Sequence, residues 1–95
     1  MLRQGDILLK KMDKLPKNLT EKNNILAYGE VTGHSHRVEG NAKVLVDTKG
    51  NQYLQSQEAQ VVHEEHTPIR VPVGDWAVVQ QREYDVQEGI RQVLD

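Results

Sequence analysis

Four histidines form two tight pairs in this sequence, His34-Ser-His36 and His63-Glu-Glu-His66. In an extended segment, side chains two residues apart project from the same face, so His34 and His36 can reach one centre. A spacing of three brings His63 and His66 together on a tight turn, which Pro68 favours nearby. We expect the function to centre on these four histidines, and if the two pairs meet, the fold holds up to four imidazoles in one place.

Such a group of imidazoles predicts one of two chemistries. Three neutral imidazoles, or two and a carboxylate, can bind zinc, iron, manganese or nickel and leave a position open for water. Metal-bound water is a nucleophile at neutral pH. The sequence leaves the cofactor open between none and a divalent metal held by His34, His36, His63 and His66. The glutamates close to them in sequence are Glu30, Glu39, Glu64 and Glu65.

The metal-free alternative is acid–base cleavage of a phosphodiester. One neutral histidine would remove the proton of a ribose 2′-hydroxyl, and a second, protonated histidine would protonate the leaving oxygen. Arg37, directly after His36, would stabilise the phosphate charge. The candidates for substrate contact are Tyr28, on the segment leading into the first pair, and Arg82 and Tyr84 near the C-terminus.

Composition narrows the classes of protein and partner. The 95 residues include no Cys and carry a formal net charge of -2, so no disulfide framework, thiolate site or broad basic surface is present, and stable binding of duplex DNA is not expected. The apolar run near the N-terminus is too short for a signal peptide or a membrane span. We expect a cytoplasmic protein with no membrane association.

Short apolar runs between turn signals predict a sheet. Strands are expected at Gly5 to Met12 and Ile25 to Val31, in two runs joined by a Lys49-Gly50-Asn51 hairpin turn, at the edge-like segment Ile69 to Val73, and in a longest strand from Trp76 to Asp85. Residues 13–24 read as a loop with one helical turn after Thr20, and residues 86–95 as a short helix or a final strand.

These elements predict a mainly β fold, with residues 1–95 as one domain. The sheet would be small and twisted, and closed as a barrel or sandwich, because closure protects edge strands. Val, Leu and Ile must fill its interior, since the chain has one Trp, three Tyr and no Phe. The exposed edge at Ile69 to Val73 leaves room for a homodimer.

The runs GDILL, GEVTGHSHR, HEEHTPI, VPVGDW and QREYD together resemble a family of small proteins from bacterial and phage genomes that have no assigned function. The resemblance covers Gly5 to Asp85 and implies that these motifs act as one unit. A partial likeness to the first metal-binding motif of cupins lies in the order Gly29, His34, His36 and Glu39. The spacing is about a residue short on each side, and no second cupin motif follows.

The leading hypothesis is a histidine-based phosphodiesterase or ribonuclease that cleaves RNA or a nucleotide second messenger. The alternatives are a cupin-like metal-binding barrel with a non-nucleotide substrate, and a non-enzymatic phage accessory module that binds an anion or a partner. The P-loop, the dinucleotide fingerprint, the Gly-x-Ser-x-Gly elbow and the zincin motif are absent from the sequence.

Overall fold

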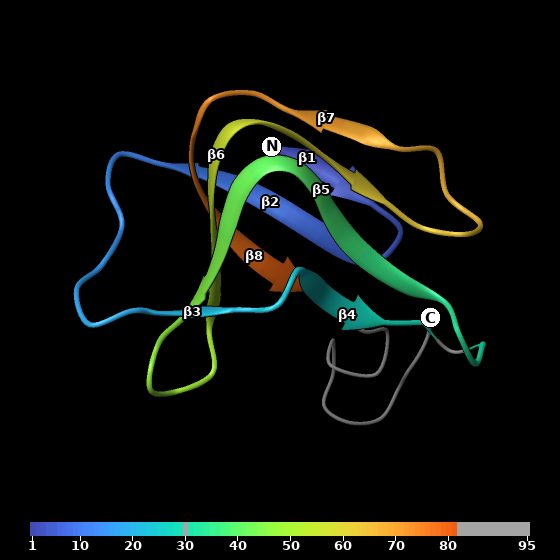
Figure 1. The fold of residues 1–95 in the computed structure, drawn as a ribbon, viewed down its shortest axis with the longest axis horizontal. Coiled ribbons are helices and arrows are strands. Elements are labelled where there is room, and N and C mark those ends of the chain that lie inside the picture. Colours follow the sequence, from blue (N-terminus) through green and yellow to red (C-terminus); the bar gives the residue numbers. More distant parts are fainter. Residues whose placement is uncertain (30, 82–95) are drawn as a thin grey trace.

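The described part of the chain forms one antiparallel β-sheet (Figure 1). The computed structural model describes residues 1–29 and 31–81, and these residues contain no helix. The mainly β prediction is therefore confirmed. The strands are β1 (Leu2–Gln4), β2 (Ile7–Met12), β3 (Thr20–Lys22), β4 (Ile25–Tyr28), β5 (Ser35–Val46), β6 (Gln52–Val62), β7 (Ile69–Val71) and β8 (Gly74–Gln80).

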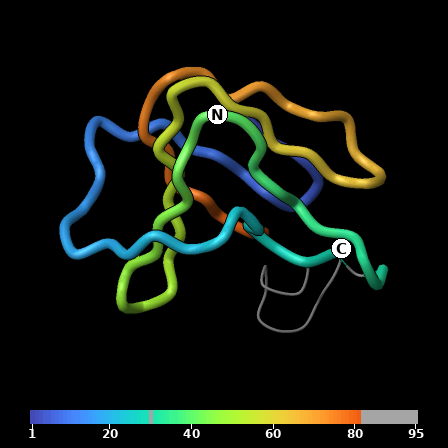
Figure 2. The backbone as a smooth tube through the Cα atoms, in the orientation of Figure 1, coloured from blue at the N-terminus to red at the C-terminus, as the bar shows by residue number. Residues whose placement is uncertain are grey.

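The long hairpin of β5 and β6 is the centre of the sheet. The two strands arch together over the other strands, as the tube drawing shows (Figure 2). A β-bulge lies at the bend, because Asn41 pairs with Glu58 while Ala42 pairs with Ser56, leaving Gln57 as an extra residue. Bulges bend a strand and increase its twist. The bend therefore divides the sheet into two halves that share one hairpin.

The bulge also keeps the apolar face of β6 turned inward through the bend. Before it the buried residues are Leu54 and Ser56, and after it they are Ala59 and Val61, so the alternation shifts by one residue. Strands β3 and β8 pair with the part of the hairpin between its turn and the bend. Strands β4 and β7 pair with the part on the other side of the bend. In Figure 1 the turn end of the hairpin points to the lower left beside β3, and its other end runs to the right between β7 and β4.

One hydrophobic cluster fills that interior and contains residues from both halves. As expected, its members are mainly Ile, Leu and Val, and Trp76 contributes the aromatic ring. The buried members are Ile7, Leu9, Leu26, Val38, Val44, Leu54, Ala59, Val61, Val71 and Trp76.

The prediction of a closed barrel is wrong. The main path of the sheet runs β1-β2-β8-β6-β5-β3, and its end strands do not pair with each other. Strand β1 does lie beside β7, but β7 is only three residues long between Pro68 and Pro72. Proline has no backbone N–H to donate, so Pro68 and Pro72 cannot extend β7 into a longer strand that would pair with β1 and close the sheet.

Of the expectations for single elements, the hairpin turn is confirmed and the helical turn is wrong. The turn between β5 and β6 is the predicted hairpin connection, and Asp47 accepts hydrogen bonds from the amides of Lys49 and Asn51 there. Residues 20–22 form a strand and not a helical turn, because they pair with Val44 to Val46. Within residues 1–29 and 31–81 the longest strand is β5, whereas the strand expected from Trp76 to Asp85 is described only as far as Gln80. The helix or strand expected at 86–95 lies outside the described residues. Among the described residues, no helix is long and apolar enough to cross a membrane.

Candidate functional site

The four histidines gather at one place on the sheet, because Arg37 of β5 pairs with Val62 of β6 and brings the two histidine pairs side by side. His36 lies on β5, His34 precedes that strand, and His63 and His66 belong to the turn after β6. The ring of His63 is central, since its centroid lies 4.4 Å from His36, 4.7 Å from His66 and 5.7 Å from His34. We call these four residues the histidine cluster.

His36 forms the buried floor of the cluster, with 3% of its surface exposed. Its Nδ1 lies 2.8 Å from Oε1 of Gln4, the last residue of β1. The Gln4 amide nitrogen donates to the carbonyl oxygens of Val61 and Thr67 at 2.9 and 3.0 Å. Because these bonds fix the orientation of the Gln4 amide, its oxygen must be the acceptor and Nδ1 of His36 the donor. The other nitrogen, Nε2, then carries the lone pair of the neutral ring.

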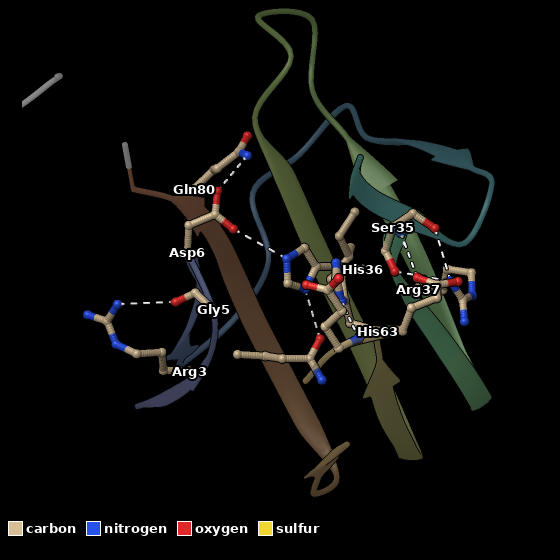
Figure 3. Close-up of polar contacts among 12 residues, drawn as sticks. Arg3, Gly5, Asp6, Ser35, His36, Arg37, His63 and Gln80 are labelled. Atoms are coloured by element: carbon tan, nitrogen blue, oxygen red, sulfur yellow. Dashed lines mark hydrogen bonds and ion pairs between the residues drawn. The ribbon is translucent and has the colours of Figure 1, made fainter. Parts of the chain in front are cut away.

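Asp6, in the turn between β1 and β2, faces that second nitrogen. Its Oδ1 lies 3.3 Å from Nε2 of His36, and its Oδ2 accepts a hydrogen bond of 2.9 Å from the side chain of Gln80 (Figure 3). Burial lowers the pKa of His36, neighbouring His63 lowers it further, and the Asp6 carboxylate opposes both effects. The result is a lone pair and a carboxylate oxygen held face to face.

His63 has the opposite proton arrangement. Its Nδ1 accepts a hydrogen bond of 3.0 Å from the amide of Glu65, so in the neutral ring the proton lies on Nε2. His66 is exposed and its ring stacks on His36, with 5.6 Å between centroids. One nitrogen from each of His36, His63 and His66 lies within 4.8 Å of the other two, and the same holds for His34, His63 and Glu64 with its carboxylate. Both sets have the composition of a metal site.

Two glycines border the cluster where an added side chain would press against a histidine. A Cβ on Gly5 would lie 2.8 Å from Nε2 of His66 and 3.3 Å from Cε1 of His36. A Cβ on Gly29, the residue after β4, would lie 3.1 Å from Nε2 of His63. The backbone therefore approaches the reactive edges of three imidazoles directly.

Arg37 does not stand free beside the histidines. Its NH1 bonds the carboxylate of Glu64 at 2.7 Å and both oxygens of Ser35 at 3.1 Å. The Ser35 amide and the Arg37 guanidinium lower the pKa of Glu64 to about 2, so this carboxylate is charged at neutral pH. All of these bonds use NH1, and Nε and NH2 of Arg37 have no acceptor among residues 1–29 and 31–81.

The remaining candidates are less close to the cluster or are not described. Tyr28 ends β4, directly before Gly29, and is 73% exposed. Arg82, Tyr84 and Glu30 lie outside the described residues. Glu39, the carboxylate of the cupin-like pattern, is exposed on β5 and takes only a 3.5 Å contact from Gln60.

Sequence reasoning missed Gln4, Asp6 and Gln80, which hold the floor of the cluster. Asp6 lies in the turn between β1 and β2, and a turn residue by itself gives no sign of which strand it will face. The pairing of β2 with β8, which places Ile7 opposite Gln80, brings these residues together. Once the fold is known, Gln4 stands out because it is a polar residue with only 3% of its surface exposed. Buried polar side chains are normally hydrogen-bonded, which points to its role.

Comparison with known proteins identifies a family for this chain but no function. No curated protein and no solved structure matches the chain. A family model described as a domain of unknown function, DUF8820, matches residues 3–81, a range that includes all four histidines, Gln4, Asp6 and Gln80. The expected likeness to a family without assigned function is thus supported at the level of the domain, and the chain belongs to the DUF8820 family.

Proposed function

We propose that this protein is a histidine-based phosphodiesterase that cleaves RNA or a nucleotide second messenger, with the histidine cluster as its catalytic centre. The observation that supports this most strongly is the convergence of nitrogens from His36, His63 and His66 within 4.8 Å. Imidazole groups exchange protons near neutral pH, and so many in one place are rarely needed for packing alone.

The cluster has an accessible side and a buried side. His66 is exposed and His34 and His63 are half-buried, whereas His36 is closed off below them. A substrate therefore meets the first three, and His36 acts beneath them. This arrangement suits a reaction in which protons are moved at the surface of a small protein while a rigid floor sets the geometry.

In RNA cleavage the cluster would act on two oxygens. A neutral imidazole takes the proton of the 2′-hydroxyl, the O2′ forms a bond to phosphorus, and the bond from phosphorus to O5′ breaks. A protonated imidazole delivers its proton to the departing O5′. The products are a 2′,3′-cyclic phosphate and a 5′-hydroxyl.

Arg37, directly after His36 and bonded to Glu64 of the turn after β6, is a source of positive charge for the phosphate. Its NH1 is engaged by Glu64, but the Nε and NH2 edge remains for a phosphate oxygen. Carboxylates of Asp6, Glu64 and Glu65 also surround the cluster. A long polyanion is disfavoured by that charge, so a short RNA or a small nucleotide is the better substrate.

The test is cleavage of labelled short RNAs and cyclic dinucleotides by purified protein. We expect products ending in 2′,3′-cyclic phosphate from RNA, and a loss of about 10²- to 10⁴-fold in rate for His63→Ala and His66→Ala. Arg37→Gln should slow the reaction, while Arg70→Gln, whose guanidinium pairs with Glu58 away from the cluster, should not. Equal turnover by a variant with alanine at all four histidines would contradict the proposal.

A further inference from the structure

We propose that the histidine cluster binds one divalent transition-metal cation, held by the imidazoles of His36, His63 and His66 and the carboxylate of Asp6. The inference deepens the proposed function and rests on it only for the use to which the cation is put. Binding of the cation stands on the geometry alone and can be tested without a substrate.

The contact between His36 and Asp6 is the first argument. Because Nδ1–H of His36 is donated to Gln4, the ring offers Asp6 a lone pair, and the carboxylate offers another. These two lone pairs repel each other, and a cation bound between them would be coordinated by both. Zinc bonds of about 2.0–2.2 Å in a tetrahedron place two ligand atoms roughly 3.3–3.5 Å apart, and the observed separation of Nε2 and Oδ1 is 3.3 Å.

The groups around this pair are arranged as outer partners of a metal site. Metal-bound histidine normally donates its second nitrogen to an oxygen, and ligand carboxylates are themselves hydrogen-bonded. Gln4 accepts from Nδ1 of His36, and Gln80 donates to Oδ2 of Asp6 at 2.9 Å. His36 and Asp6 thus each have one atom fixed by a glutamine, and their other atoms, Nε2 and Oδ1, face each other at 3.3 Å.

His63 and His66 complete the set from the accessible side. Their nitrogens lie within 4.8 Å of one another and of a His36 nitrogen, a wider span than between ligands of a bound zinc. Since His66 is exposed and His63 half-buried, these two rings can close on the fixed floor. At Gly5 and Gly29 the absence of a side chain matters here, because an added Cβ would lie 2.8 Å from Nε2 of His66 and 3.1 Å from Nε2 of His63.

The donor atoms select the class of cation. Imidazole nitrogens suit zinc, iron, nickel and copper, whereas magnesium and calcium require oxygen ligands. The cation would also offset the charges of Asp6 and Glu65, for which the described residues supply no paired arginine or lysine. In catalysis, it would lower the pKa of a bound water or hydroxyl and take over part of the proton transfer.

Coordination predicts one local change in hydrogen bonding. When Nε2 of His63 binds a metal, its proton must lie on Nδ1, which now accepts from the Glu65 amide. That hydrogen bond must therefore be exchanged on binding. The chemical shift of the Glu65 amide should therefore change when His63 binds a metal.

The experiment is titration of untagged, chelator-treated protein with Zn²⁺ and with Mg²⁺, followed by calorimetry and by the Glu65 amide resonance. We expect one Zn²⁺ per chain, no uptake of Mg²⁺ at equal concentration, and a shift of that resonance. His66→Gln and Asp6→Asn should weaken Zn²⁺ binding by about 10- to 100-fold. Glu39→Gln, a carboxylate change on β5 outside the cluster, is the matched control and should bind as the unchanged protein does.

These measurements can refute the metal site and the phosphodiesterase activity independently of each other. Zn²⁺ uptake that depends on His66 and Asp6 supports the metal site even if no RNA or nucleotide is cleaved. Cleavage that continues in chelator, by protein that takes up no Zn²⁺, overturns the metal site and keeps the phosphodiesterase. Zn²⁺ binding of equal strength in His66→Gln and Asp6→Asn also overturns the assignment of ligands.

Discussion

Replacing Gln4 by methionine should destabilise the protein far more than its position three residues into the sheet suggests. Methionine has nearly the same length but no group to bond His36, Val61 or Thr67. Two buried partners are then left unpaired, the Nδ1–H of His36 and the carbonyl of Val61. At about 1–3 kcal/mol for each, and with part recovered by burial of the methionine, we expect a loss of roughly 2–5 kcal/mol.

That loss is large for a domain of this size. A chain of 95 residues has a free energy of unfolding of roughly 5–14 kcal/mol. Urea unfolding followed through Trp76, the chain's single tryptophan, measures the change directly, because this side chain is buried in the core. The control is Gln60→Met, on an exposed position of β6, where we expect a change within about 0.5 kcal/mol.

The same substitution should release the tautomer of His36. In the unchanged protein we expect a slowly exchanging Nδ1–H resonance from His36, and in Gln4→Met we expect this signal to exchange with water. If Gln4→Met unfolds at the same urea concentration as Gln60→Met, then the Gln4 side chain does not hold the floor of the cluster, and the reasoning about His36 fails with it.

Other predictions concern the core, the hairpin and the glycines. Leu54→Ala, at a fully buried position, should cost about 2–5 kcal/mol in urea unfolding, whereas Leu45→Ala, which is only half-buried, should cost less. Bonds from Asn51 chiefly, and also from Lys49, lower the pKa of Asp47 from 3.8; their stabilisation is present above that pH and lost as the pH falls through the lower, folded value. The stability difference between the protein and Asp47→Ala should therefore shrink in acid, and a constant difference would refute this. Gly29→Ala should displace His63 and perturb its ring resonances, while Gly50→Ala, with no neighbouring atom near its Cβ position, should leave them unchanged.

Local spacing carried the predictions that succeeded. The hairpin around Gly50 depends on residues close together in the chain, so a pattern a few residues long was enough to indicate it. The apolar character of Leu54 and Val61 likewise indicated the core. In each case the information lies within one strand or one turn.

Long-range pairing explains what the sequence did not reveal. The roles of Gln4 and Asp6 depend on β2 pairing with β8 and on β1 lying beside β7, and no pattern in the first ten residues encodes those neighbours. The open sheet follows from the short β7 between two prolines, whereas edge protection in general favours closure. The bulge at Gln57 was equally hidden, since Gln57 and Glu58 are both polar.

The pairing of Ile7 with Gln80 affects how the protein folds during translation. The first strands of the sheet must wait for a partner made more than seventy residues later, and contacts so distant along the chain form slowly. The histidines can approach one another once the β5–β6 hairpin has left the ribosome. Their floor, however, reaches its final form only when β8 has emerged, so we expect the nascent chain to lack the complete cluster until Gln80 has been synthesised.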